Sequence, residues 1–242
     1  SLKSFKNSFA SFICGNFSYK SIVFADLKTF QAHGVYGCGI VTALTAQNPH
    51  KVFSISPIDA NYVAEQIDAV LDADLEYVHA FIGTSPLHRD YKLKMDKSKI
   101  IETAVNAVEY AKDHGLLVEL AAEDSTRTDI EYLRRIFKAT IDAGADRICP
   151  CDTLGVLTPL KSFNFYRKFS DLGVPVSAHC HNDFGLAVAN TLSAIDGGAT
   201  RFHATINGLG ERAGNAALEE VVVSLNTLYK YSDDDDESRY KT

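Results

Sequence analysis

The chain has 242 residues, of which 46% are hydrophobic and 23% charged, a composition typical of a globular domain. Its formal net charge of −7 argues against a nucleic-acid partner, because such a surface needs an excess of Lys and Arg. No apolar run reaches the roughly 18 residues of a membrane-spanning helix, so we expect no membrane partner. The five cysteines are odd in number and lie in apolar segments, which favours a reducing, cytoplasmic location over a disulfide framework.

The first third of the chain gives a weak pattern. Residues 1–24 contain short apolar runs that do not distinguish strand from helix. The spacing then predicts a short helix from Asp26 to His33, a buried strand from Gly39 to Thr45, a loop from Ala46 to Pro49 and a helix from Asp59 to Asp72.

From Tyr77 onward, predicted strands alternate with predicted helices. The strands are Tyr77–Ile82, Leu116–Leu120, Arg147–Cys149, Val174–Ala178 and Arg201–Ile206. The helices follow Asp96, span Ile130–Ile141, run from Pro159 to Leu172, end near Ile195 and cover Leu218–Leu228. Such alternation predicts an α/β fold, a single (β/α)8 TIM-barrel-like domain over residues 1–231, with an open doubly wound parallel sheet as the alternative. Residues 232–242 are expected to be an acidic, disordered tail.

Polar side chains gather where the predicted strands end, which is where α/β folds place their chemistry. Examples are His79, Glu119, Asp152, Thr153 and His203. A glutamate inside the apolar sequence Leu-Val-Glu-Leu is costly to bury unless it is paired.

The residues around His179 and His181 indicate a reactive site. Residues i and i+2 of a strand point to the same face, so the two imidazoles are expected to project together. Followed by Asn and Asp, they fit either a divalent metal site or an acid–base cluster.

Several segments together resemble the catalytic barrel of the 2-isopropylmalate, citramalate and homocitrate synthases. The matching segments are Phe81–His88, Tyr91–Met95, Val118–Asp124, Cys151–Gly155, His179–Asp183 and Gly208–Asn215. The resemblance spans residues 77–231 and implies a TIM barrel that performs a Claisen condensation of acetyl-CoA with a 2-oxo acid at a divalent metal (Mg, Mn or Zn). Acetyl-CoA and the 2-oxo acid are then the expected partners, and a homodimer is left open.

The resemblance also implies residue roles. It assigns the metal to His179, His181 and Asn215, substrate binding to His79, Thr153 and Glu119, and a catalytic role to Glu119. The family's first-strand motif with Arg-Asp-Gly has no counterpart before residue 77. Two histidines and an amide bind a divalent metal weakly without a carboxylate, so the sequence predicts weak metal binding and impaired activity.

Another part of the chain resembles a different family, the hydroxymethylpyrimidine (phosphate) kinases with their ribokinase-like fold. The matching segments are Ala25–Gly37, Val41–Asn48 and Val63–Leu71. Within them Gln47 matches a pyrimidine-contacting residue, but the Gly-rich substrate loop and the ATP-binding half have no counterpart. Together the two resemblances imply a chimera, natural or engineered, with a kinase-like fragment in residues 1–72. The alternative function is therefore a non-catalytic barrel that at most binds metal or a small acid.

Overall fold

The computed structural model describes residues 13–17, 39–48, 51–57 and 77–230. Its main feature is a five-stranded sheet in the order β4-β5-β6-β7-β8, with every neighbouring pair parallel. The strands are β4 Tyr77–Gly83, β5 Leu117–Glu123, β6 Arg147–Asp152, β7 Ser177–Cys180 and β8 Arg201–Phe202. The α/β class predicted from the alternating pattern is confirmed.

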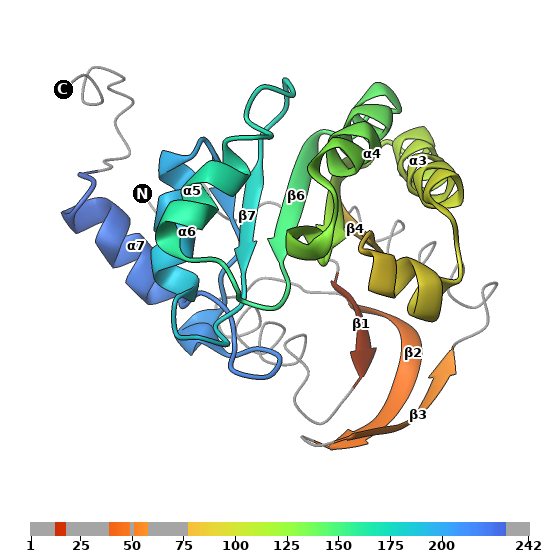
Figure 1. The fold of residues 1–242 in the computed structure, drawn as a ribbon, viewed down its shortest axis with the longest axis horizontal. Helices are drawn as coiled ribbons and strands as arrows, with labels where there is room; N and C mark the ends of the chain where they lie inside the picture. Colours follow the sequence, from red (N-terminus) through yellow and green to blue (C-terminus); the bar gives the residue numbers. More distant parts are fainter. Residues whose placement is uncertain (1–12, 18–38, 49–50, 58–76, 231–242) are drawn as a thin grey trace.

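Five α-helices of the described region follow these strands. They are α3 Lys97–Asp113, α4 Ile130–Asp142, α5 Pro159–Tyr166, α6 Ala187–Asp196 and α7 Leu218–Thr227. Figure 1 shows α3 and α4 on one flank of the strands and α5, α6 and α7 on the other. Asp96 and Asp129 start α3 and α4, because each carboxylate accepts a hydrogen bond from a first-turn amide, at 2.8 Å and 2.9 Å.

A second, three-stranded sheet holds β1 Ile13–Phe17, β2 Gly39–Asn48 and β3 Lys51–Pro57. The pair β1 and β2 is parallel, whereas β2 and β3 are antiparallel. The predicted loop at Ala46–Pro49 is wrong in part, since β2 runs on to Asn48; Pro49 lies outside the described residues. The helices expected at 26–33 and 59–72, and the tail at 232–242, lie outside the described residues.

Three predicted boundaries are corrected in the second half of the chain. The strand β7 begins at Ser177 rather than Val174, because Pro175 has no N–H to donate to a neighbouring strand. The helix α5 ends at Tyr166, well before Leu172, and Thr158 precedes it without a side-chain capping bond. The strand β8 has two residues, since the backbone turns into a short 3₁₀ segment at Ile206–Gly208.

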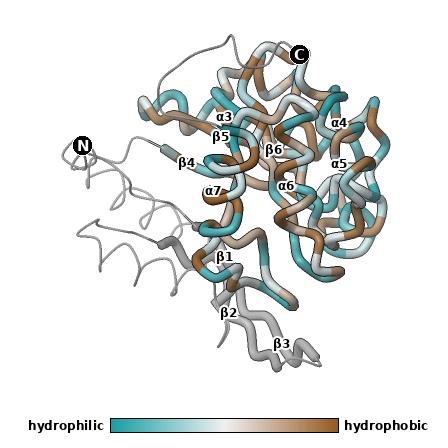
Figure 2. Tube along the Cα trace, turned by 90° about the vertical axis from the view of Figure 1, so that its left-hand side faces the viewer, coloured by the Kyte–Doolittle hydropathy of each residue, from teal (hydrophilic) through white to brown (hydrophobic). Residues whose placement is uncertain are grey.

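The core lies between the sheet and its helices. Each helix buries one side, and in Figure 2 the helical segments accordingly carry hydrophobic and hydrophilic positions next to each other. An aromatic cluster joins α4 to the α5 region: Phe137 and Phe169 are fully buried, with ring centroids 5.5 Å apart in an edge-to-face arrangement. Within the described residues, no helix has the length and apolarity to cross a bilayer.

We expect Phe137→Ala to lower the free energy of unfolding by about 3–5 kcal/mol, because it removes a fully buried ring and leaves a cavity beside Phe169. Chemical denaturation followed by circular dichroism measures the change. Leu160→Ala is the control, since this side chain on α5 is 72% exposed and its loss should change stability by less than about 0.5 kcal/mol. Equal effects of both substitutions would contradict the packing described here.

Candidate functional site

A buried carboxylate, Glu119 on β5, is the centre of a polar cluster inside the sheet. It lies opposite His79 in the β4–β5 register, and His79 Nδ1 is 2.9 Å from Glu119 Oε1. The same oxygen lies 2.8 Å from Nε2 of His203, which follows β8. Ser177 Oγ on β7 donates to Glu119 Oε2 at 2.5 Å. Glu119 is only 1% exposed, so these contacts replace the water it loses on folding.

The charge of Glu119 is maintained by its partners. Burial by itself raises the pKa of this carboxyl group, but the hydrogen bonds from His203 and His79 outweigh burial and hold the pKa below its usual range. The neighbouring Tyr77 responds in the opposite direction: burial, followed by the negative charge of Glu119, raises the pKa of its hydroxyl. The cluster therefore contains one ionised carboxylate surrounded by donors.

The predicted imidazole pair lies at the end of β7. His179 Nε2 and His181 Nε2 are 3.1 Å apart. Two nitrogens bound to one metal at about 2.1 Å lie roughly 3.0–3.4 Å apart, so this separation suits two ligands of one ion. Burial lowers the pKa of His181 to about 4, followed by the charge of Arg212, and burial also lowers that of His179 well below its usual range. Both imidazoles are therefore neutral near pH 7, the form that binds metals.

Asn215 lies beside His181, because the two residues form an antiparallel bridge. Among the described residues, neither His181 Nδ1 nor Asn215 Oδ1 has a hydrogen-bond partner, although both atoms are buried. A Cβ atom at Gly210 would overlap Asn215 Oδ1, so the glycine is what leaves room for this amide. Buried polar atoms without partners are uncommon, and here they belong to two of the three predicted metal ligands.

The loop that carries Asn215 is fixed to the sheet by Arg212. Its Nε and Nη2 donate to the two carboxylate oxygens of Asp183 at 2.7 Å and 2.8 Å, and Nη2 also donates to the carbonyl of Thr153. The Arg212 guanidinium accordingly lowers the pKa of Asp183. The backbone of Arg212 has φ 58°, a left-handed conformation uncommon for a residue with a side chain. The bidentate pair compensates for this local cost.

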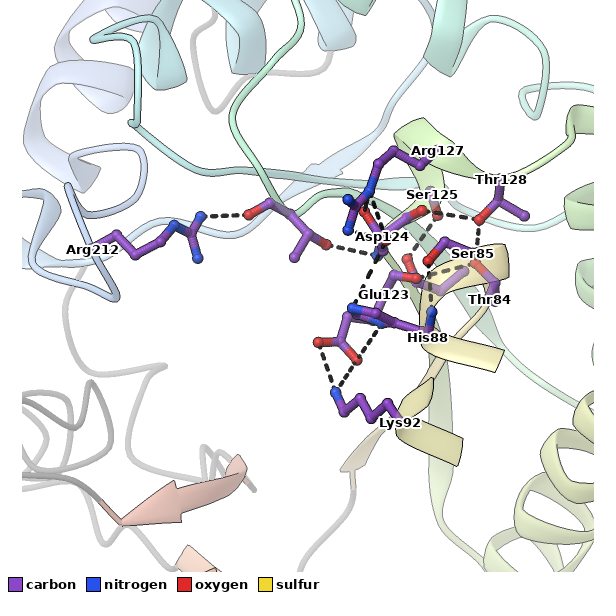
Figure 3. A network of polar contacts seen from close by, with 12 residues as sticks. Thr84, Ser85, His88, Lys92, Glu123, Asp124, Ser125, Arg127, Thr128 and Arg212 are labelled. Carbon is purple, nitrogen blue, oxygen red and sulfur yellow. Dashed lines mark hydrogen bonds and ion pairs between the residues drawn. The ribbon is translucent and has the colours of Figure 1, made fainter. Parts of the chain in front are cut away.

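Figure 3 shows how Arg212 connects to a second network at the ends of β4 and β5. Thr153 Oγ1 accepts from the amide of Asp124 at 2.8 Å, and the Asp124 carboxylate accepts from Arg127 Nε at 2.8 Å and 2.9 Å. The adjacent Glu123 binds Lys92 Nζ at 2.7 Å, which ties the π-helical turn His88–Leu93 to β5. This network orders the loops around the strand ends.

The predicted site residues therefore fall into three groups. His79 and Glu119 are in direct contact, and His179, His181 and Asn215 are gathered at the end of β7. Thr153 instead contacts Asp124 and Arg212, in the loop network.

Three functional candidates were not assigned from the sequence. Ser177 could have been found by the alternation that pairs His179 with His181, since residues 177, 179 and 181 share one face of β7. His203 was noted only as a polar residue at a strand end. Arg212 lies in the matching segment Gly208–Asn215 but was given no role, because its partner Asp183 is 29 residues away.

A divalent cation could also be bound within the Glu119 cluster. Ligand atoms of His79, Glu119 and His203 all lie within 4.8 Å of one another. These are nitrogen and carboxylate ligands, a set that suits Zn²⁺ and Mn²⁺.

These features define an α/β protein that places imidazoles and a carboxylate in ligand geometry at its strand ends. The chain matches the HMGL-like family over residues 30–237, and it belongs to that family. It is 55% identical over 166 residues to the (R)-citramalate synthase of Methanocaldococcus jannaschii, covering 68% of this chain and 34% of that protein. It is 54% identical over 171 residues to the 2-isopropylmalate synthase of the same organism, covering 70% and 33%.

Solved structures agree on the fold. Hydroxymethylglutaryl-CoA lyase from Pseudomonas aeruginosa superposes with a TM-score of 0.61 at 21% identity, covering 69% of this chain and 61% of the lyase. The predicted TIM-barrel class is confirmed, and the open doubly wound alternative is set aside. The chain spans about a third of the length of the curated relatives it matches.

The kinase resemblance is not supported by these comparisons. The HMGL-like match begins at residue 30 and so covers most of the segment from Ala25 to Leu71 that was assigned to a kinase. Parallel βα units recur in both folds, so a short segment without its catalytic motifs carries little family information.

We expect Arg212→Lys to loosen the loop from Gly208 to Asn215, because lysine keeps the charge but cannot make the bidentate pair with Asp183. The loss should be about 1 kcal/mol of local protection, since Arg212 is partly exposed. Hydrogen–deuterium exchange of the loop amides should become about fivefold faster. Arg201→Lys, at the exposed first position of β8, is the matched control and should leave this loop unchanged. Unaltered exchange in Arg212→Lys would show that the pair does not fix the loop.

Proposed function

We propose that the chain carries the catalytic barrel of an acyltransferase that condenses acetyl-CoA with a 2-oxo acid, as citramalate and 2-isopropylmalate synthases do. The observation that carries the proposal is the His179–His181 pair with Asn215 beside it, in a chain 54–55% identical to synthases of both types over 166–171 residues. A cytoplasmic location fits the three described cysteines, all of which are free and buried.

His179, His181 and Asn215 are the residues we propose to hold the divalent metal. The Nε2 separation of 3.1 Å and the partnerless buried Oδ1 of Asn215 fit this role. A bound Mg²⁺, Mn²⁺ or Zn²⁺ supplies Lewis acidity that polarises the carbonyl of the 2-oxo acid. With two imidazoles and one amide, the described residues supply no carboxylate to this ion, so we propose weak binding.

The Glu119 cluster provides the second part of the proposed site. The carboxylate orients His79, whose side chain is 27% exposed, by accepting a hydrogen bond from its Nδ1. His79 Nε2 then faces away from Glu119: in the neutral form it can accept a proton, and in the protonated form it can donate to a substrate carboxylate. We propose that Glu119 selects the 2-oxo acid side chain and that Thr153 helps to bind the substrate carboxylate.

The proposal is tested by following free CoA with a thiol reagent while the protein is incubated with acetyl-CoA, Mn²⁺ and either pyruvate or 2-oxoisovalerate. We expect CoA release that depends on the 2-oxo acid, and the preferred acid identifies the synthase type. His179→Ala should lower the rate at least about 100-fold, because it removes a metal ligand. His114→Ala, on an exposed residue at the end of α3, is the control.

A second candidate is a non-catalytic barrel that binds metal or a small acid without turning substrate over. It is favoured by one observation, the lack of an Arg-Asp-Gly motif before residue 77. Two results together would establish this candidate instead. The wild-type protein would release CoA no faster than a reaction without protein, and it would bind Mn²⁺ in a way that His179→Ala abolishes.

A further inference from the structure

A continuous series of hydrogen bonds runs through the interior from Glu119 to His181. Glu119 Oε1 lies 2.8 Å from His203 Nε2, and His203 Nδ1 lies 3.2 Å from His179 Nδ1. His179 Nε2 in turn faces His181 Nε2 at 3.1 Å. Resting on the metal site proposed above, we infer that His203 is a positioning residue: with Glu119 it fixes the tautomer of His179, so that the Nε2 lone pair of His179 faces the metal.

Each step follows from which atoms can donate. An ionised carboxylate only accepts hydrogen bonds, so the hydrogen between Glu119 and His203 must be on His203 Nε2. In neutral His203 the other nitrogen, Nδ1, is then an acceptor. The facing Nδ1 of His179 must therefore carry its hydrogen, which leaves the lone pair of that ring on Nε2.

The arrangement matches what a metal-binding histidine requires of its surroundings. Such ligands usually donate their second N–H to a group behind them, and loss of that group typically weakens metal binding by about 10- to 100-fold. Here the group behind His179 is a second imidazole, which is itself oriented by a carboxylate that is 1% exposed. The buried charge of Glu119 on β5 thus orients, through His203, the ring of the proposed metal ligand His179 at the end of β7.

Simple packing is the competing explanation, because the rings of His179 and His203 also meet edge to face with centroids 5.4 Å apart. Two substitutions separate the explanations. His203→Phe keeps an aromatic ring but cannot hydrogen-bond, whereas His203→Gln loses the ring but can accept from His179 and donate to Glu119. If packing is what matters, His203→Phe should retain metal binding better than His203→Gln. If the tautomer is what matters, His203→Gln should retain it better.

The first experiment uses the wild-type protein without metal, so it does not depend on any variant folding. Long-range ¹H–¹⁵N NMR correlations at pH 8 distinguish the two neutral tautomers of each imidazole. We expect His179 to carry its hydrogen on Nδ1 and His203 to carry its hydrogen on Nε2. His179 with its hydrogen on Nε2 would overturn the inference, whatever the activity of the protein.

The second experiment measures Mn²⁺ affinity by electron paramagnetic resonance. We expect His203→Phe to bind about 10- to 100-fold more weakly than wild type and His203→Gln to stay within about threefold of wild type. His114→Phe, a histidine-to-phenylalanine change at an exposed site, should bind as wild type does. Thermal melts establish that each variant is folded.

His179→Ala distinguishes failure of the inference from failure of the proposed site. If it abolishes Mn²⁺ binding while His203→Phe binds normally, the site is right and the tautomer control is wrong. If His179→Ala binds normally, the ion is held elsewhere and both proposals fall. In that case loss of binding in His79→Phe would place the ion in the Glu119 cluster.

Discussion

The burial of Glu119 is the constraint on which the interior of this protein depends. An ionised carboxylate that is 1% exposed is tolerated only if neighbouring groups replace its hydration. The replacements come from three other strands or their ends: His79 on β4, Ser177 on β7 and His203 after β8. None of these residues can change freely, because removing one donor leaves part of a buried charge without a partner.

Parallel register explains how one carboxylate reaches so many partners. In a parallel sheet each strand presents every second side chain to the same side, and neighbouring strands align these side chains in layers. His79 is opposite Glu119 in register, and Cys151 is opposite His179. The cluster of His79, Ser177 and His203 around Glu119 therefore results from the register of the whole sheet. That register brings groups from distant parts of the sequence within hydrogen-bond distance.

Much of the second half of the fold was predictable, because its helices carry clear apolar spacing and end signals. Asp96 caps α3 as predicted, and the observed boundaries of α4 and α7 lie within one residue of the predicted ones. The antiparallel β3 was not predicted, since a short apolar strand reads the same whichever direction it runs. For the site, the pairing of His179 with His181 follows from alternation within one strand, but the contacts of Glu119 depend on register between strands, which one sequence does not specify.

Two separate sets of contacts meet at the His179–His181 pair, and they constrain different degrees of freedom. From the interior, Glu119 and His203 act on the hydrogen of the His179 ring. From the loops, Arg212 holds the segment that brings Asn215 beside His181. The first set is anchored on a carboxylate that is 1% exposed, whereas the Arg212 side chain that anchors the second set is 41% exposed, so solvent and salt screen its ion pair more strongly. The interior set therefore acts on the orientation of the His179 ring, and the loop set acts on the position of Asn215 beside His181.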